Sequence, residues 1–262
     1  MSTPVAIGFF DSGVGGFSVL RHALNAVNGI PLLYVADTAF APYGARSVEE
    51  VVERSRTITR FMLEQGAEAI VVACNTATAM AVDRLRSEFD IPIIGMEPAI
   101  KPAAQLTRSA RVAVLATGGT LASDRYARLR SDHGRQIEVH ECICRHWVEA
   151  VEQGDLDSPR VLDLVNAELA PLHRIGIDTY VLGCTHYPFL VPAIRAVVGE
   201  DVQLVDPGPA VIGQLRRRLG LLSVEPPSVS PVRLYTSGSP ALLQRHAQRL
   251  IGLSAECHRL PA

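Results

Sequence analysis

The sequence predicts an α/β protein made of two similar domains, each with a mainly parallel sheet flanked by helices. Short aliphatic runs alternate with helical stretches, and a β-α-β alternation requires parallel pairing with right-handed crossovers. The order of features also repeats along the chain. In each half, a strand that ends in a turn is followed later by a strand that ends in a cysteine. The turn residue Asp11 precedes Cys74 by 63 residues, and the turn residue Thr117 precedes Cys184 by 67. This echo predicts two related halves.

In the first half, a glycine-rich turn between the first strand and the first helix forms a backbone-amide site suited to an anion. Ser47 and Glu50 form a capping box that starts a helix ending at Gly66. The expected strands are Val5–Phe10, Leu32–Ala36, Ala69–Ala73 and Ile91–Gly95, and the other expected helices are Val19–Ala26 and one from Cys74 to Arg86.

The second half starts afresh after Pro98 with a helix, and a further helix follows the Thr117-Gly-Gly-Thr120 turn. Runs of apolar residues, bounded by polar ones, predict its strands and the last strand of the chain. These strands are Val112–Ala116, Ile137–Glu141, Thr179–Gly183, Val202–Val205 and Val232–Tyr235, and the later helices are Trp147–Glu152, Val161–His173, one after Pro207 and Leu242–Ile251.

The composition favours a small-molecule partner. The net charge of −2 comes from scattered residues, which argues against a nucleic-acid footprint and a polybasic membrane patch. The N-terminus lacks the basic and apolar regions of a secretory signal, and no apolar run is long enough to span a bilayer. We therefore expect a cytoplasmic protein, whose five cysteines are free thiols.

Cys74 and Cys184 each follow a predicted strand and precede a predicted helix. Ligands of open α/β sheets bind at the carboxyl ends of strands, and helix N-terminal amides lower the pKa of a thiol. A single free cysteine is often only a small buried hydrophobe, but two in this setting favour a site with two thiols. We interpret Cys142, Cys144 and Cys257 as structural.

Two other site types match the sequence poorly. Gly13-x-Gly15-x-x-Ser18, with Asp37 further along, approaches a dinucleotide fingerprint, but Asp11 would repel the pyrophosphate. Asp11 suits a ligand that carries an ammonium group, while the amides of the turn take a carboxylate. Cys184-x-His186 lacks a second ligand pair, so we expect no metal site.

The remaining polar candidates have ordinary structural interpretations. His186 can be a core or solvated histidine, although beside a thiol it could hold the thiolate or relay its proton. By default Glu152 is a solvated charge on a short helix, Asp37 caps the loop after its strand, and Pro42-Tyr43-Gly44 is a turn.

Four motifs together resemble the glutamate racemases over nearly the whole chain, and they are similar to the wider aspartate/glutamate racemase group. They are Phe10-Asp11-Ser12-Gly13-Val14-Gly15-Gly16, Ala41-Pro42-Tyr43-Gly44, Ala73-Cys74-Asn75-Thr76-Ala77 and Gly183-Cys184-Thr185-His186-Tyr187-Pro188.

This resemblance implies a cofactor-independent isomerase that interconverts L- and D-glutamate and supplies D-glutamate for peptidoglycan synthesis, and hence for cell wall biogenesis and cell shape. It implies two α/β domains, residues 1–97 with 207–262 and residues 98–206, with the active site in the cleft between them. Glutamate is the implied partner, with neither nucleic acid nor membrane, and a homodimer is possible.

The resemblance also implies the roles of site residues. Cys74 would exchange the α-proton of D-glutamate and Cys184 that of L-glutamate, assisted by Asp11, Asp37, Glu152 and His186. The residues that match substrate-binding positions are Asp11, Ser12, Pro42, Tyr43, Gly44, Asn75, Thr76, Thr117, Thr120, Thr185 and His186.

The chemistry agrees with two thiols, because inverting a weakly acidic Cα–H needs a base on one face and an acid on the other. Two alternatives stay open at this point. One is a racemase of aspartate or a related amino acid, and the other is a two-domain amino-acid-binding protein without catalytic activity.

Overall fold

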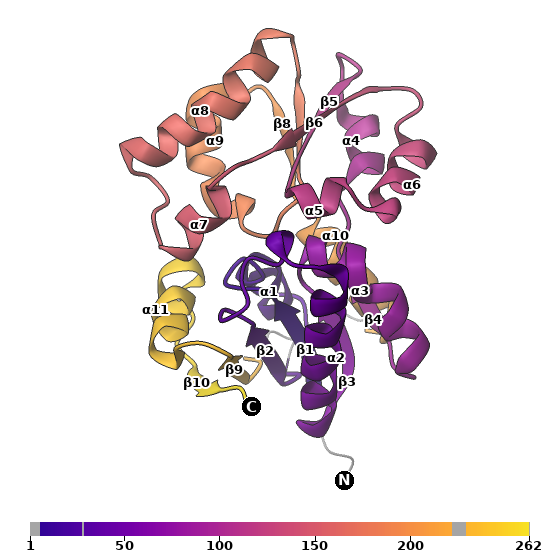
Figure 1. Cartoon of the computed structure of the whole chain (residues 1–262), viewed down its shortest axis with the longest axis vertical. Coiled ribbons are helices and arrows are strands. Elements are labelled where there is room, and N and C mark those ends of the chain that lie inside the picture. Colours follow the sequence, from indigo (N-terminus) through magenta and orange to yellow (C-terminus); the bar gives the residue numbers. More distant parts are fainter. Residues whose placement is uncertain (1–5, 28, 222–228, 262) are drawn as a thin grey trace. The chain divides into compact units, whose positions relative to one another are not determined.

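A computed structural model describes residues 6–27, 29–221 and 229–261 of the chain (Figure 1). Val5, the first residue of the first predicted strand, lies outside these residues. The chain divides into two compact units, residues 1–96 with 208–262 (unit 1) and residues 97–207 (unit 2). Each boundary lies one residue from the one that we expect. Among the described helices, none has the length and apolar character needed to cross a membrane.

Unit 1 is built on a six-stranded sheet in the order β10-β9-β2-β1-β3-β4, in which every pair is parallel. Its strands are β1 (Ala6–Asp11), β2 (Leu32–Ala36), β3 (Ala67–Val72), β4 (Ile93–Gly95), β9 (Val232–Thr236) and β10 (Glu256–Arg259). Its helices are α1 (Phe17–Leu24), the 3-10 helix η1 (Tyr43–Ala45), α2 (Val48–Glu64), α3 (Asn75–Glu88), α10 (Gly208–Arg218) and α11 (Pro240–Ile251).

One apolar cluster of unit 1 lies between its sheet and helices α2 and α3. Alternate residues of each strand point into it, among them Leu33 and Val35 of β2 and Ile70 and Val72 of β3. The central strands β1 and β2 are buried along their whole length, as expected where helices cover both faces of a parallel sheet. Tyr43 and Cys74 belong to the same apolar cluster, so the packing of this cluster holds both predicted site residues in place.

Unit 2 has a four-stranded parallel sheet in the order β6-β5-β7-β8. Its strands are β5 (Arg111–Ala116), β6 (Glu138–Ile143), β7 (Thr179–Leu182) and β8 (Gln203–Val205). Its helices are α4 (Ile100–Leu106), α5 (Gly118–Leu121), α6 (Asp124–His133), α7 (Trp147–Glu152), α8 (Pro159–Arg174), the 3-10 helix η2 (Tyr187–Leu190) and α9 (Val191–Val198). Figure 1 shows these helices around the sheet.

The two units share one strand order. In each, the first strand lies between the second and third, and the fourth pairs with the third, which gives β2-β1-β3-β4 and β6-β5-β7-β8. Cys74 follows β3 and Cys184 follows β7, so the two thiols leave equivalent strands. Strands β9 and β10 extend only the sheet of unit 1 beyond β2. Two similar parallel-sheet α/β units are therefore confirmed.

Several element boundaries differ from the predictions. The first helix begins at Phe17, two residues early, and β4 begins at Ile93 because Ile91 precedes the pairing region. One helix was expected after Thr120, but α5 ends at Leu121 and a second helix, α6, follows. Ser123 is the N-cap of α6 and accepts a hydrogen bond from the Tyr126 amide at 3.1 Å. Strand β10 was not predicted, because it is short and mostly exposed and lacks an apolar run.

Candidate active site

Cys74 is the N-cap of helix α3. Its extended backbone continues from β3, and its Sγ accepts a hydrogen bond from the amide of Ala77 at 3.4 Å. The residue is buried. The predicted position at a strand-to-helix junction is thus confirmed for this thiol, and the first-turn amides of α3 favour its charged form.

The glycine turn after β1 brings Asp11 and Ser12 to the same place. Asp11 is fully buried, and its Oδ1 accepts a hydrogen bond from the Gly13 amide at 2.6 Å, so that amide is used within the turn. The Cys74 thiol lies 3.9 Å from Ser12 Oγ, toward which it can donate. A Cβ on Gly16 would lie 2.8 Å from Asp11 Cβ, so this position needs glycine to admit Asp11.

Asn75 and Thr76 form the first turn of α3 and are buried. The Asn75 amide nitrogen donates to the carbonyl of Met96 at 3.4 Å. Its Oδ1 is buried without a hydrogen-bond partner among the described residues. An unmatched buried acceptor is costly, which marks this oxygen as a place where a donor from a ligand would be accepted.

The default interpretation expected Asp37 to cap the loop after β2, and the structure shows a different role. The Asp37 carboxylate is fully buried and accepts a hydrogen bond from the Tyr43 hydroxyl at 2.6 Å. Arg54 of α2 donates to both of its oxygens. The Asp37 amide donates to the Asp11 carbonyl at 3.0 Å, which ties the ends of β1 and β2 together.

Pro42, Tyr43 and Gly44 form more than a turn, since Tyr43 opens the 3-10 helix η1 with Pro42 as its N-cap. The Tyr43 ring is buried in the core beside Cys74. Burial and the neighbouring Asp37 carboxylate raise the pKa of Tyr43 well above its usual range. Its hydroxyl therefore stays protonated and donates to Asp37.

Cys184 lies at the end of β7, but the expected helix start after it is wrong. A turn leads from Cys184 into η2, and α9 begins only at Val191. The sulfur instead lies 3.6 Å from Nδ1 of His186, and both residues are buried. The imidazole of His186 is thus within reach of this thiol and can stabilise its charge when protonated, whereas Cys74 has a helix amide in this role.

Glu152 is not a solvated charge, because it comes from α7 to bind His186. Its Oε1 lies 2.7 Å from His186 Nε2, and the Glu152 side chain is only 22% exposed. Burial lowers the pKa of His186, but the hydrogen bonds and charges of Cys184 and Glu152 outweigh burial and raise that pKa above its usual range. The three side chains form a thiol-imidazole-carboxylate chain within unit 2.

The threonines of unit 2 occupy turns at the ends of the same sheet. Thr117 is the N-cap of α5 and accepts a hydrogen bond from the Thr120 amide at 3.3 Å, and the two hydroxyls are 3.1 Å apart. Thr185 Oγ1 lies 3.5 Å from His186 Nδ1. These hydroxyls lie at the ends of β5 and β7, which are neighbours in the sheet.

The other cysteines fit a structural interpretation. Cys142 and Cys144 are buried with their sulfurs 4.0 Å apart, and burial together with Cys142 raises the pKa of Cys144 well above its usual range. Cys257 is half-buried on β10. Over the part of the chain that the structure describes, no cluster of three or more His, Cys, Asp or Glu is arranged to hold a metal ion.

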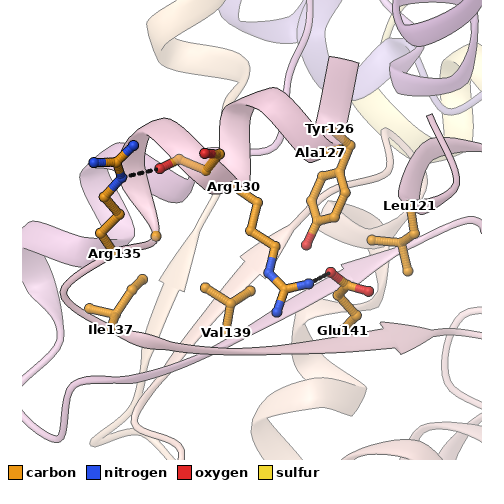
Figure 2. Close-up of a pocket in the computed structure, with 10 residues that line it drawn as sticks. Leu121, Tyr126, Ala127, Arg130, Arg135, Ile137, Val139 and Glu141 are labelled. Atoms are coloured by element: carbon orange, nitrogen blue, oxygen red, sulfur yellow. Dashed lines mark hydrogen bonds and ion pairs between the residues drawn. The ribbon is translucent and has the colours of Figure 1, made fainter. Parts of the chain in front are cut away.

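A hollow of about 480 Å³ lies between α6 and β6, and Leu121 at the end of α5 also lines it (Figure 2). Arg130 of α6 crosses it to Glu141 of β6, donating a hydrogen bond at 2.9 Å. None of the predicted site residues lines this hollow. It therefore does not locate the site that the sequence predicts.

The structure thus gathers the predicted residues into two groups. Unit 1 holds Asp11, Ser12, Asp37, Pro42, Tyr43, Gly44, Cys74, Asn75 and Thr76, and unit 2 holds Thr117, Thr120, Glu152, Cys184, Thr185 and His186. Sequence reasoning missed Arg54, which is bound to Asp37. An arginine on an amphipathic helix carries no local signal that distinguishes a buried partner from solvent.

Comparison with known proteins agrees with this geometry. The model of the Asp/Glu/Hydantoin racemase family matches residues 13–215. The glutamate racemase of Methylococcus capsulatus is 49% identical over 236 residues, which cover 90% of this chain and 87% of the relative.

Among solved structures, glutamate racemase of Escherichia coli in complex with L-glutamate and the activator UDP-MurNAc-Ala superposes with a TM-score of 0.88 at 30% identity, covering 98% of both chains. Glutamate racemase of Bacillus anthracis superposes with a TM-score of 0.87 at 31% identity, covering 98% of this chain and 97% of that chain. The chain therefore belongs to the Asp/Glu/Hydantoin racemase family.

Proposed function

We propose that this chain interconverts L- and D-glutamate without a cofactor, using Cys74 and Cys184 as its two proton-transfer groups. One observation carries the proposal: a buried thiol follows the equivalent strand, β3 or β7, in each of two sheets of the same order. The identity to glutamate racemases, including one solved with L-glutamate, supports glutamate as the substrate.

The substrate would be held by groups of both charges. Asp11 and the unmatched Oδ1 of Asn75 suit the ammonium group. Amides and hydroxyls suit the two carboxylates. We assign this second role to Ser12, Tyr43, Gly44, Thr76, Thr117, Thr120, Thr185 and His186. Pro42 has no amide hydrogen to donate, and we assign to it the shaping of the loop before Tyr43.

In the direction from D- to L-glutamate, Cys74 starts as the thiolate and Cys184 as the thiol. Cys74 Sγ takes the α-proton, and the electron pair of the broken C–H bond stays on Cα and delocalises into the carboxylate. The Cys184 thiol then gives its proton to the opposite face of Cα. The protonation states of the two sulfurs are now exchanged, which is the state needed for the reverse direction.

Each thiolate would be stabilised by its own surroundings. At Cys74 the stabilising groups are the first-turn amides of α3. At Cys184 they are the imidazolium of His186 and, behind it, the carboxylate of Glu152. We assign Asp37 to holding Tyr43 rather than to proton transfer, because Arg54 and Tyr43 occupy its oxygens.

The remaining parts of the proposal concern the cell. We propose a cytoplasmic enzyme that forms a homodimer and supplies D-glutamate for peptidoglycan synthesis. We also propose that its two domains comprise residues 1–97 with 207–262 and residues 98–206. Light scattering of the purified protein tests the dimer. Rescue of a D-glutamate auxotroph by the gene tests the supply.

The activity is tested with freshly reduced protein in D₂O, incubated with either glutamate enantiomer and no added cofactor. We expect the antipode to form with deuterium at Cα, as measured by chiral chromatography and mass spectrometry. If neither enantiomer gave its antipode and neither took up deuterium at Cα, the proposal would be overturned. L-aspartate in a parallel assay separates an aspartate racemase, and a binding protein would leave both amino acids unchanged.

A further inference from the structure

We infer that Arg54 is a positioning residue for the loop that carries Pro42, Tyr43 and Gly44, and that it acts through Asp37. The inference rests on the proposed function, because this loop is assigned there to the substrate. Arg54 lies on α2, 17 residues from Asp37, and does not belong to any of the motifs that resemble the family.

Arg54 binds Asp37 as a two-pronged fork. Its Nε donates to Asp37 Oδ2 at 2.9 Å, and its Nη2 donates to Oδ1 at 2.8 Å. The Asp37 side chain is completely buried and that of Arg54 is 21% exposed. A paired geometry of this kind fixes orientation as well as charge, because the planar guanidinium matches both carboxylate oxygens at once.

The same carboxylate holds the loop. Tyr43 donates its hydroxyl to Asp37 Oδ2, the oxygen that also accepts from Arg54 Nε. Tyr43 is 1% exposed and opens η1, so fixing its ring also fixes the backbone of Gly44. Arg54 therefore orients the Asp37 carboxylate, and that carboxylate in turn orients Tyr43 and the loop.

Arg54 also touches the loop directly. Its guanidinium carbon lies 4.0 Å from the centre of the Phe40 ring, which is a cation–π contact. The carbonyl of Phe40 accepts a hydrogen bond from Arg46 Nε at 2.8 Å. Arg54 of α2 therefore contacts this segment directly at Asp37 and Phe40, and it reaches Tyr43 through Asp37.

A buried carboxylate requires this partner. Removing Arg54 would leave the buried Asp37 carboxylate without its counter-charge, so water must enter the site or the loop must move to expose the carboxylate. Either change weakens the bond to Tyr43 and releases the loop. A displacement of about 1 Å in a positioning group can cost about 10²-fold in rate.

The test compares Arg54→Met and Arg54→Lys with Arg60→Met, an exposed arginine on the same helix. Racemisation of L-glutamate is measured for kcat and KM, and folding by urea denaturation. We expect Arg54→Met to raise KM about 10- to 100-fold with a smaller change in kcat, because the thiols are untouched. Arg54→Lys keeps the charge without the fork, so its KM should rise about 3- to 10-fold. Arg60→Met should stay within about twofold.

A double-mutant cycle tests that Arg54 acts through Asp37. Asp37→Asn removes the buried charge but leaves an oxygen for the Tyr43 hydroxyl. If Arg54 works through Asp37, adding Asp37→Asn to Arg54→Met makes KM no worse and restores part of it. Additive losses would contradict the inference.

The two proposals fail in different ways. A wild-type protein that does not racemise glutamate refutes the proposed function. An active wild type whose folded Arg54→Met variant keeps KM within about twofold overturns the role of Arg54. If Arg54→Met does not fold, Arg54→Lys decides, since an unchanged KM there overturns the role of the fork and a raised KM in a folded variant supports it.

Discussion

Cys74 and Cys184 end equivalent strands of two sheets with the same order, but they are surrounded by different chemistry. Cys74 caps an α-helix, with the Ala77 amide 3.4 Å from its sulfur and Ser12 beside it. Cys184 is followed by a turn and a 3-10 helix, and His186 lies 3.6 Å away. One thiol faces backbone dipoles and the other faces an ionisable side chain.

This difference shows that a shared strand order sets where a thiol lies and leaves open how it is activated. Backbone amides keep their dipoles at every pH, whereas an imidazole loses its charge when it loses its proton. The Cys184 group is therefore the one whose activation should depend on pH. Glu152 counters this dependence, because its hydrogen bond helps to raise the pKa of His186.

The residues before the two thiols differ as well. Ala73 donates its amide to the carbonyl of Phe10 at 2.8 Å, and Gly183 donates to that of Leu115 at 2.7 Å. A Cβ on Gly183 would lie 2.7 Å from the Leu115 carbonyl oxygen. The equivalent turn in unit 2 is thus too tight for the alanine that unit 1 carries.

The largest expected effect tests whether both thiols transfer protons. Cys74→Ser and Cys184→Ser should each lower kcat/KM by about 10³-fold or more, because a serine hydroxyl is too weak an acid for this exchange. The half-buried Cys257 provides the matched control, and Cys257→Ser should stay within about twofold. If one active-site variant kept a tenth of the activity, its sulfur would not be a proton-transfer group and the comparison would lose one member.

The pH profile tests the imidazole at Cys184. Glu152→Gln removes a group that raises the pKa of His186, so the alkaline limb of kcat/KM should move to lower pH and the rate should fall about 10- to 100-fold. The control is Glu149→Gln, an exposed carboxylate on the same helix. If the pH profiles of kcat/KM for wild type and Glu152→Gln were superimposable, His186 would not be the group that activates Cys184.

The ion pair between His186 and Glu152 should also make the free energy of unfolding depend on pH. Because the pKa of His186 is raised in the folded state, its contribution to stability is fully present below the ordinary histidine value of about 6.5 and is lost as pH rises through the raised pKa. Over that rise, urea denaturation should show a larger loss for wild type than for Glu152→Gln. An equal loss in both would contradict the ion pair.

The tight turn at Gly183 predicts a moderate effect. Gly183→Ala should lower the free energy of unfolding by about 1–3 kcal/mol, because the new Cβ meets backbone that cannot move aside cheaply. Gly118→Ala is the control, since its Cβ would find Ile143 at 3.8 Å. Ala73→Gly in unit 1 should cost about 1–2 kcal/mol, through chain entropy and the loss of a buried methyl group. Urea midpoints measure all three, and equal midpoints for both glycine variants would rule out the clash.

The smallest expected effect concerns Ser12. A sulfur contact at 3.9 Å is weak, so Ser12→Ala should change the alkylation rate of Cys74 by iodoacetamide only about two- to fivefold. Peptide mass spectrometry measures Cys74 and Cys184 in one sample, and Cys184 serves as the internal reference. A change above tenfold at Cys74 would show that Ser12, rather than the helix, dominates there.

The sequence by itself determined what depends on near neighbours. Ser47 and Glu50 are three residues apart, and their capping box forms as predicted. The apolar run Leu32–Ala36 is strand β2 at both of its predicted ends. Alternating strands and helices also required two parallel α/β units, because crossover connections allow few other arrangements. The thiols at the ends of β3 and β7 followed from that pattern.

The tertiary structure alone decided which side chains meet. Glu152 reaches His186 across 34 residues, and Arg54 reaches Asp37 across 17, and neither charge differs locally from a solvated one. The stretch after Cys184 is compatible with a helix start or a turn, and only packing selects the turn. Asp37 and His186 are buried, and a charge removed from water needs a counter-charge. Folding supplies that counter-charge from a distant part of the chain, as Arg54 and Glu152 show.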